Sequence, residues 1–243
     1  MATTKVTSSV RTLATNEIVT ANITDANVTT VKLADDAVTL AKMAPGTDGN
    51  LITYDASGNP AAVATGSLGN VLTSAGAGAP PTMSMPSTIT SDTSVGTGNS
   101  YDITGIPAGV RCVHVLFEGV STASTSAILV QLGDAGGIET SGYVAEGSHL
   151  ISGSVASTAS STAGFLMSYH AAAQSLSGVM DLYLKDAANF TWISSHNGRL
   201  ATNIVVNGAG VKSLSAALTQ IRITTVNGSQ AFDAGTVALQ YGY

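Results

Sequence analysis

The sequence predicts a mainly β protein in which a repetitive, intertwined trimeric shaft precedes an antiparallel β-sandwich head of jelly-roll type. Three observations lead to this fold class. A ten-residue repeat occupies residues 16–45, a twenty-residue repeat occupies residues 46–86, and residues 87–243 contain short alternating segments separated by turns. No part of residues 87–243 has the periodicity of a long amphipathic helix, so strands are the expected element there.

Residues 1–15 are the predicted N-terminal attachment segment. They are rich in Thr and Ser, carry the bases Lys5 and Arg11, and show no apolar period. Such a terminus is expected to become ordered only against a partner. It lacks the apolar core of a signal peptide, and no stretch of the chain approaches the ~18 apolar residues of a membrane span. We therefore expect synthesis in the cytoplasm and no membrane insertion.

The ten-residue repeat aligns apolar residues at three positions of each unit. These are Ile18, Val28 and Val38; Ala21, Val31 and Ala41; and Ile23, Leu33 and Met43. Their offsets scatter around a helix and switch faces in a strand, so a single chain cannot bury them on one stripe. A repeat that cannot cover its own apolar residues stacks on neighbours. Residues 16–45 are therefore predicted to form a homotrimer, and short helical turns and short strands both fit the repeat length.

The twenty-residue repeat begins after the chain breaker Pro45-Gly46. Residues 49–53 recur as residues 69–73, Gly58 recurs as Gly78, and Pro60 recurs as Pro80. Each unit has the composition of a short strand, a Gly-rich turn and a proline that limits further pairing. We interpret residues 46–86 as a second, β-rich shaft section. A flexible linker is the alternative, because residues 76–81 contain only Gly, Ala and Pro.

Residues 87–243 are predicted to form the β-sandwich head, because short apolar segments recur in them at fairly regular spacing. Within residues 179–184, for example, odd-numbered positions face one way and even-numbered positions the other. The size of this region is close to that of a jelly roll. The expected strands are residues 101–104, 110–118, 128–132, 164–169, 179–184, 190–194, 220–226 and 236–241.

Turn residues separate these predicted strands. They occur at residues 133–137, at residues 185–189 and at Asn227-Gly228, and the last pair is a strong signal for a two-residue hairpin. Residues 153–164 are almost wholly Ser, Thr and Ala, and we expect them to form an exposed loop.

The composition limits the classes of partner. Charged residues are only 10% of the chain, and the net charge of −6 includes no basic block, so no nucleic-acid partner is expected. Low charge also suits a surface that binds neighbours. The single cysteine, Cys112, lies in an apolar run and is expected to be a buried packing residue rather than a nucleophile.

Three stretches, taken in order, relate the chain to a known family. They are residues 27–44 (NVTTVKLADDAVTLAKMA), residues 69–81 (GNVLTSAGAGAPP), and residues 222–228 (RITTVNG) with residues 232–236 (FDAGT). Together they resemble the tail fibre proteins of tailed bacteriophages. The resemblance implies a trimeric fibre that joins the virion through its N-terminal side and touches the host surface with its C-terminal head. Similar fibres also decorate capsids.

No catalytic residue is predicted. A carbohydrate hydrolase needs a positioned pair of carboxylates, one of them held protonated, whereas the acids of the head are scattered. They are Asp92, Asp102, Glu118, Asp134, Glu139, Glu146, Asp181, Asp186 and Asp233. Ser195-His196 is only a dipeptide without a nucleophile elbow. No phosphate loop is present either, so no cofactor is predicted.

Four histidines are candidates for a metal ion on a threefold axis, where one residue from each chain supplies three ligands. They are His114, His149, His170 and His196. None has a partner at zinc-like spacing, so no metal site is predicted. His114 is expected to be packed or hydrogen-bonded within its strand.

Receptor contact favours exposed aromatic side chains and loops at one end of a sandwich. The aromatic candidates are Tyr143, Trp192, Tyr241 and Tyr243, although Trp192 is expected in the core. The candidate loops are residues 121–126, 153–163 and 195–203. No individual receptor-binding residue is predicted.

These features predict a non-enzymatic structural fibre of the virion, made in the cytoplasm of the host bacterium. Its N-terminal region would bind other virion proteins, and its head would bind a glycan or protein of the host surface. The alternatives are a capsid decoration fibre without essential receptor binding and a surface-glycan depolymerase.

Overall fold

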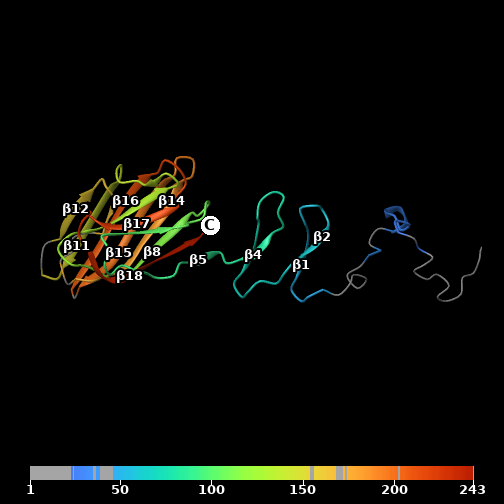
Figure 1. Ribbon diagram of the computed structural model, residues 1–243, viewed down its shortest axis with the longest axis horizontal. Helices are drawn as coiled ribbons and strands as arrows, with labels where there is room; N and C mark the ends of the chain where they lie inside the picture. The colour runs from blue at the N-terminus through green and yellow to red at the C-terminus, as the bar shows by residue number, and fades with distance from the viewer. Residues whose placement is uncertain are drawn as a thin grey trace, which may run out of the picture. The chain divides into compact units, whose positions relative to one another are not determined.

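The protein is mainly β, and all of its sheets are antiparallel, as the sequence predicts (Figure 1). The computed structural model describes residues 23, 25–34, 37–38, 46–153, 156–167, 172, 174–201 and 203–242. The chain divides into two compact units, residues 1–65 and residues 66–243. The division falls between the two twenty-residue repeats. The predicted attachment segment, residues 1–15, lies outside the described residues.

The described part of the first unit contains one short helix and one hairpin. The 3-10 helix η2 (Thr30–Lys32) lies within the ten-residue repeat. Strand β1 (Leu51–Tyr54) pairs with β2 (Pro60–Val63), and Asp55 closes the turn between them by accepting the N–H groups of Ser57 and Asn59 at 2.8 and 2.9 Å. These hydrogen bonds lower the pKa of the Asp55 carboxyl. Residues 16–22, 24, 35–36 and 39–45 of the repeat lie outside the described residues.

The second unit begins with a matching hairpin of β3 (Val71–Thr73) and β4 (Thr82–Ser84). The repeated sequence therefore builds the same element twice. Gly49 and Gly69, which occupy equivalent positions before β1 and β3, have φ of 80° and 90°. Only glycine adopts this region without strain, which explains why the glycine recurs with the strand.

Two antiparallel sheets form the head. The larger has the order β12-β11-β16-β15-β14-β8-β18-β5, with β6 beside β18; the smaller has the order β10-β9-β17-β7, with β13 beside β9. The larger sheet consists of β5 (Ser87–Ile89), β6 (Thr93–Ser94), β8 (Cys112–Thr122), β11 (Val144–Ile151), β12 (Ser157–Ser161), β14 (Leu176–Asp186), β15 (Thr191–Ala201), β16 (Ile204–Ser213) and β18 (Phe232–Gly242). The smaller consists of β7 (Ser100–Thr104), β9 (Ile128–Asp134), β10 (Gly137–Ile138), β13 (Phe165–Leu166) and β17 (Gln220–Thr225).

The hydrophobic core lies between the two sheets and makes the head a β-sandwich. Met180 and Leu182 of the larger sheet and Ile221 and Ile223 of the smaller one belong to the same buried cluster, and each is 0% exposed. Tyr183, between the alternating core residues of β14, is 49% exposed. The alternation predicted for residues 179–184 is therefore confirmed.

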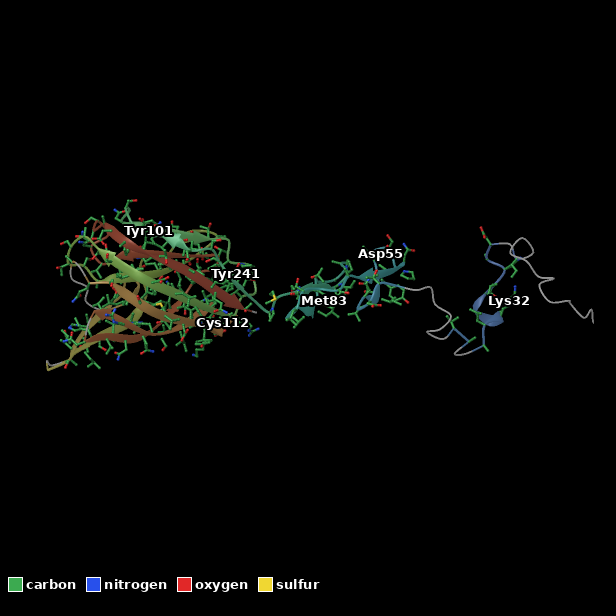
Figure 2. All side chains as sticks on the ribbon, turned by 90° about the horizontal axis from the view of Figure 1, so that it is seen from below. Lys32, Asp55, Met83, Tyr101, Cys112 and Tyr241 are labelled. Atoms are coloured by element: carbon green, nitrogen blue, oxygen red, sulfur yellow. The ribbon has the colours of Figure 1, made fainter. Side chains whose placement is uncertain are left out.

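The strand registers define two ends of the head. At the near end, β5 begins at Ser87, β8 begins at Cys112 and β18 ends at Gly242. At the far end, residues 96–99, 123–127 and 226–231 meet. Figure 2 shows Cys112 and Tyr241 toward the near end and Tyr101 toward the far end. Cys112 was expected to be buried, but it lies half-buried on the outer face of the larger sheet.

Strands occupy part of the predicted loop 153–164 and most of the predicted loop 195–203. Within residues 153–164, β12 pairs with β11 from Ala145↔Ser161 to His149↔Ser157. Its side chains are mostly exposed because it is an edge strand, so its sequence contains none of the large apolar residues that mark a buried strand. Residues 195–201 belong to β15, and in residues 121–126 the first two residues still belong to β8.

The predicted hairpin at Asn227-Gly228 is wrong. Strand β17 belongs to the smaller sheet and β18 to the larger one, so residues 226–231 cross between the sheets. Asn227 Oδ1 accepts the N–H groups of Ser229 and Gln230 at 3.2 and 2.9 Å. The turn chemistry was recognised correctly, but the partner of each strand is set by the core rather than by the turn.

The sequence prediction also missed β11 and β16, because both contain glycines. These glycines make room for large rings between the sheets. A Cβ on Gly208 would lie 2.4 Å from Cε1 of His196, and a Cβ on Gly210 would lie 2.8 Å from Cδ1 of Phe165. Glycine in a strand marks such a close approach.

Candidate functional surfaces of the head

The acids of the head are mostly held by neighbouring side chains. Six of the nine contact a base, a hydroxyl or an amide: Asp102 with Arg222, Asp134 with Ser215, Glu139 with Lys212, Asp181 with His114, Asp186 with Asn189, and Asp233 with Ser121. Apart from the pairing of Asp186 with Asn189, which lies within one turn, these pairings could not be predicted from the sequence, because their partners are as much as 120 residues apart.

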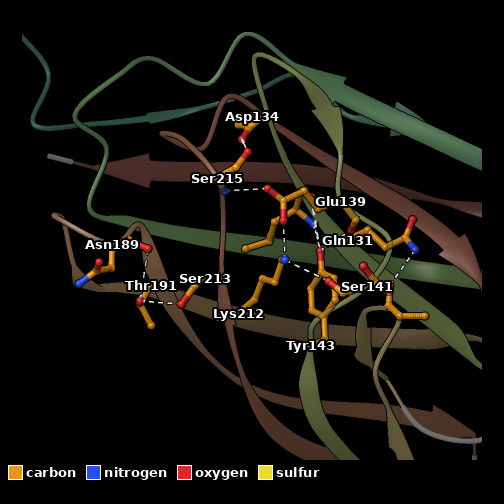
Figure 3. A network of polar contacts seen from close by, with 12 residues as sticks. Gln131, Asp134, Glu139, Ser141, Tyr143, Asn189, Thr191, Lys212, Ser213 and Ser215 are labelled. Atoms are coloured by element: carbon orange, nitrogen blue, oxygen red, sulfur yellow. Dashed lines mark hydrogen bonds and ion pairs between the residues drawn. The ribbon is translucent and has the colours of Figure 1, made fainter.

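A polar network at the near end brings two of these carboxylates together (Figure 3). Ser215 donates its N–H to Glu139 at 2.7 Å and its Oγ–H to Asp134 at 2.5 Å. The hydrogen bond from Ser215 lowers the pKa of Asp134. Burial alone would raise the pKa of Glu139, but hydrogen bonds from Lys212 and Ser215 outweigh it and lower that pKa. A glycosidase acid needs a raised pKa, so this pair has the wrong electrostatics for that role.

Lys212 is the centre of the same network. It is 5% exposed, forms an ion pair with Glu139, and donates to the carbonyl oxygen of Ser141 at 3.0 Å. Its Nζ lies 5.2 Å from the centroid of the Tyr143 ring, a cation–π contact. The Tyr143 hydroxyl accepts the N–H of Leu132 at 2.6 Å, and burial raises the pKa of Tyr143. The network joins the ends of β9 and β16 to the connections β10–β11 and β16–β17, and so links both sheets at the near end.

Ser195 and His196 cannot act as a catalytic pair, because neighbouring residues of a strand face opposite sides. Ser195 lies on the exposed face of β15, whereas His196 is 2% exposed and points into the sandwich. Neither ring nitrogen of His196 has a hydrogen-bond partner, and burial lowers its pKa to about 4.

The other predicted metal candidates do not converge in the described part of the chain. His114 Nδ1 lies 2.6 Å from Asp181 Oδ1, so His114 is hydrogen-bonded within its sheet as expected. His149 is half-buried on β11, and His170 lies outside the described residues. Among the described residues, no group of three or more His, Cys, Asp or Glu side chains is placed to hold a metal ion.

The aromatic candidates for receptor contact are mostly internal. Trp192 is 2% exposed, in the core as expected, whereas Tyr143 is 1% exposed and is the wrong candidate for a contact. Tyr241 packs partly buried against the core, and Tyr243 lies outside the described residues.

The loops that do meet at the far end form a connected surface. Phe232 donates its N–H to the carbonyl of Gly98 at 2.8 Å, Ala123 donates to Ala231 at 3.0 Å, and Val226 donates to Ala127 at 2.9 Å. A groove of about 420 Å³ opens there. Its lining combines hydroxyl and amide side chains with apolar ones: Thr125, Ser126, Ser160, Ser161, Asn227, Leu166 and Val226.

Among the described residues that line it, this far-end groove has no charged side chain. Hydroxyls, an amide and four apolar side chains, two of them alanines, can contact neutral, hydrogen-bonding ligands such as saccharides or peptide backbone. Of the predicted loops, residues 121–126 and 153–163 contribute to it and residues 195–203 do not. Sequence reasoning missed Val226 and Asn227, because Val226 was assigned to a strand and Asn227 to a hairpin turn.

No family model, curated protein or solved structure matches the chain. No helix in the described part of the chain is long and apolar enough to span a membrane.

Proposed function

We propose that the protein is a non-enzymatic virion fibre of a tailed bacteriophage, assembled as a homotrimer. Residues 1–15 join other virion proteins, residues 16–86 form the trimeric shaft, and the jelly-roll-like sandwich of residues 87–243 attaches to a glycan or protein of the host surface. The mechanism is multivalency: three weak sites on one stalk, and several stalks on one particle, raise avidity through effective concentration.

The observation that carries this proposal is the exposure of apolar side chains in the ten-residue repeat. Val28, Val31 and Val38 are 54%, 91% and 59% exposed in the single chain, and Leu33 is 44% exposed. Burial of these apolar side chains by other copies of the repeat would stabilise the assembly by about 25 cal/mol per Å² of apolar surface removed from water. Self-assembly of the shaft would bury these side chains.

The far-end groove is the receptor surface that we assign to the head. It lies at the opposite end of the sandwich from Ser87, where the chain passes from the shaft into the head. A groove in that position faces away from the point of attachment and remains accessible in an assembled fibre. Loops on a rigid scaffold are the usual place for recognition.

Two measurements test the proposal. Light scattering on the full chain should give about three times 24.2 kDa, and a monomeric mass would contradict the shaft. Saturating full-length protein should also block adsorption of the phage to susceptible cells. Asn227→Lys should weaken the block by placing a charge in the neutral groove, and Thr104→Lys, on the exposed outer face of β7, should leave it unchanged.

The alternatives give different results in the same experiments. A capsid decoration fibre would be trimeric, would leave adsorption untouched at saturation, and would be found on the capsid by electron microscopy. A depolymerase would release oligosaccharide from host surface glycan. The lowered pKa values of Asp134 and Glu139 argue against that chemistry at the near-end network.

A further inference from the structure

The outer face of the larger sheet exposes large apolar side chains. Val144, Leu150, Tyr183, Ile193 and Val205 lie on this face of β11, β14, β15 and β16, and they are 68%, 47%, 49%, 41% and 49% exposed. An antiparallel sheet with one face in water normally carries polar residues there. The same face also carries the hydrogen-bonded pair of His114 and Asp181, so its apolar side chains share the face with polar ones.

Four apolar residues of this face stand in one row. Val144 pairs with Val211, Val211 with Ile193, and Ile193 with Tyr183. We call Val144, Val211, Ile193 and Tyr183 the near belt. The same row continues from Tyr183 to Cys112, Gly242 and Ser87. The near belt is therefore level with the first residue of β5, where the chain enters the head.

We propose that the near belt is the interface through which the heads of three copies of this chain pack against one another. This inference rests on the proposed trimeric fibre. Three chains that leave one shaft are closest together where each passes into its head, so the level of Ser87 is where neighbouring heads meet first. A contact around a threefold axis is heterologous, so one part of each near belt meets a different part of the next copy's belt, and the three contacts close as a ring.

The size of the face suits a stable contact. Five strands, β8 to β11 in sheet order, are about 24 Å wide at ~4.8 Å per strand, and strands of about ten residues are about 33 Å long. The product, about 800 Å², is the area of the whole outer face and equals what each partner contributes to a standard interface, so the near belt is the apolar edge of a contact that also uses the rest of this face. On the same face, further from Ser87 than the near belt, a groove of about 430 Å³ is lined by the polar residues Glu146, Asn197 and Asn207. Such a groove holds the ordered water that wet interfaces contain.

The native cysteine gives a direct measurement of this interface. Cys112 is the only cysteine, lies directly beside Tyr183 in the belt row, and is half-buried. A spin label on Cys112 of the full chain reports the distances between copies by pulsed electron resonance. Light scattering on the labelled protein first establishes that its mass is unchanged by the label.

The near belt predicts a narrow label-to-label distance distribution in the trimer. Ile193→Lys and Tyr183→Lys, each introducing a charge on an exposed position of the belt, should broaden it while the mass stays trimeric. Thr104→Lys on the other sheet should leave it narrow. If the protein is a trimer but its distance distribution is broad and neither belt variant changes it, this interface is wrong and the fibre proposal still holds. If the protein is a monomer, both proposals are wrong.

Discussion

The head and the ten-residue repeat treat their apolar residues in opposite ways. In β14 of the head, Met180 and Leu182 are 0% exposed, because every second residue points between the sheets. In the repeat, Val31 is 91% exposed and Val38 is 59% exposed. Both regions use β-branched and aliphatic side chains, so the difference lies in their spacing and not in their composition.

This difference indicates that the spacing of apolar residues determines whether they can be buried within one chain. A period of two matches a strand, so the head covers its apolar face with a second sheet of the same chain. The repeat offsets match neither a strand nor a helix, and in the proposed trimer other copies of the chain bury these residues. The stability of the head should therefore depend little on protein concentration, whereas the repeat should be ordered only on assembly.

A pair of charge insertions tests this difference most strongly. Leu182→Asp places an unpaired charge in the core, at a cost comparable with the ~5–15 kcal/mol that stabilises a typical domain, so the head should unfold. Val31→Asp should instead prevent assembly and leave the head folded. The fluorescence of Trp192, the single tryptophan and 2% exposed, reports the fold of the head. Light scattering reports the mass.

Two outcomes would contradict this difference between the head and the repeat. If Val31→Asp chains kept the trimeric mass, the repeat would not be the assembly surface. If Leu182→Asp chains kept the blue-shifted emission of a buried tryptophan, the head core would not be continuous through β14.

The same principle explains how much of the fold could be predicted. Strands β9, β14 and β17 have strong alternation or β-branched runs, and all three were predicted, β9 and β17 close to their bounds and β14 in its central six residues. Strands β11 and β16 were missed, because Gly147, Gly208 and Gly210 interrupt their apolar pattern. A local sequence pattern therefore reveals a strand only where large side chains of that strand fill the core.

The candidate sites were less predictable than the strands, because they depend on partners distant in sequence. The near-end network joins Lys212 to Glu139 and Ser215 to Asp134, and no short motif contains these residues. The far-end groove requires β12 to lie beside residues 125–127 and 226–227. Only the packing of the two sheets brings such segments together.

Removing Glu139 should cause the largest loss of stability short of unfolding. In Glu139→Ala, Lys212 keeps its position at 5% exposure without its carboxylate. Removing one partner of a buried ion pair, so that the other charge stays buried and unpaired, typically lowers the free energy of unfolding by ~3–5 kcal/mol. Urea unfolding followed by Trp192 fluorescence should show this loss. Lys212→Met with Glu139→Leu should recover much of it, and failure of that double variant to do so would argue against an uncompensated charge as the cause.

The stability of the head should also fall in acid because of His196. Burial lowers the pKa of His196 to about 4 in the folded state, against an ordinary value of 6.5. The unfolded chain therefore binds this proton first, and stability falls as pH decreases from about 6.5 to about 4. At ~1.4 kcal/mol per pKa unit, the loss is at most ~3.5 kcal/mol.

A matched variant isolates this histidine from the acids. The carboxyls of Asp102, Asp134 and Glu139 have lowered pKa values, so their contributions are lost only below the ordinary carboxyl range. His196→Leu should remove the decline between pH 6.5 and 4 and keep the decline at lower pH. An unchanged decline in His196→Leu would mean that another group titrates in that window.

The ion pair on the outer face of the smaller sheet should contribute least. Arg222 donates from Nε and Nη2 to the two oxygens of Asp102 at 2.6 and 2.8 Å, and this pairing lowers the pKa of Asp102. The two side chains are 37% and 31% exposed, for Asp102 and Arg222 respectively, so water and salt screen their attraction. Asp102→Asn should cost no more than ~1 kcal/mol in the same urea experiment, and less at high salt. A loss as large as that of Glu139→Ala would mean that assembly buries this face too, and that the near belt is not the only place where heads meet.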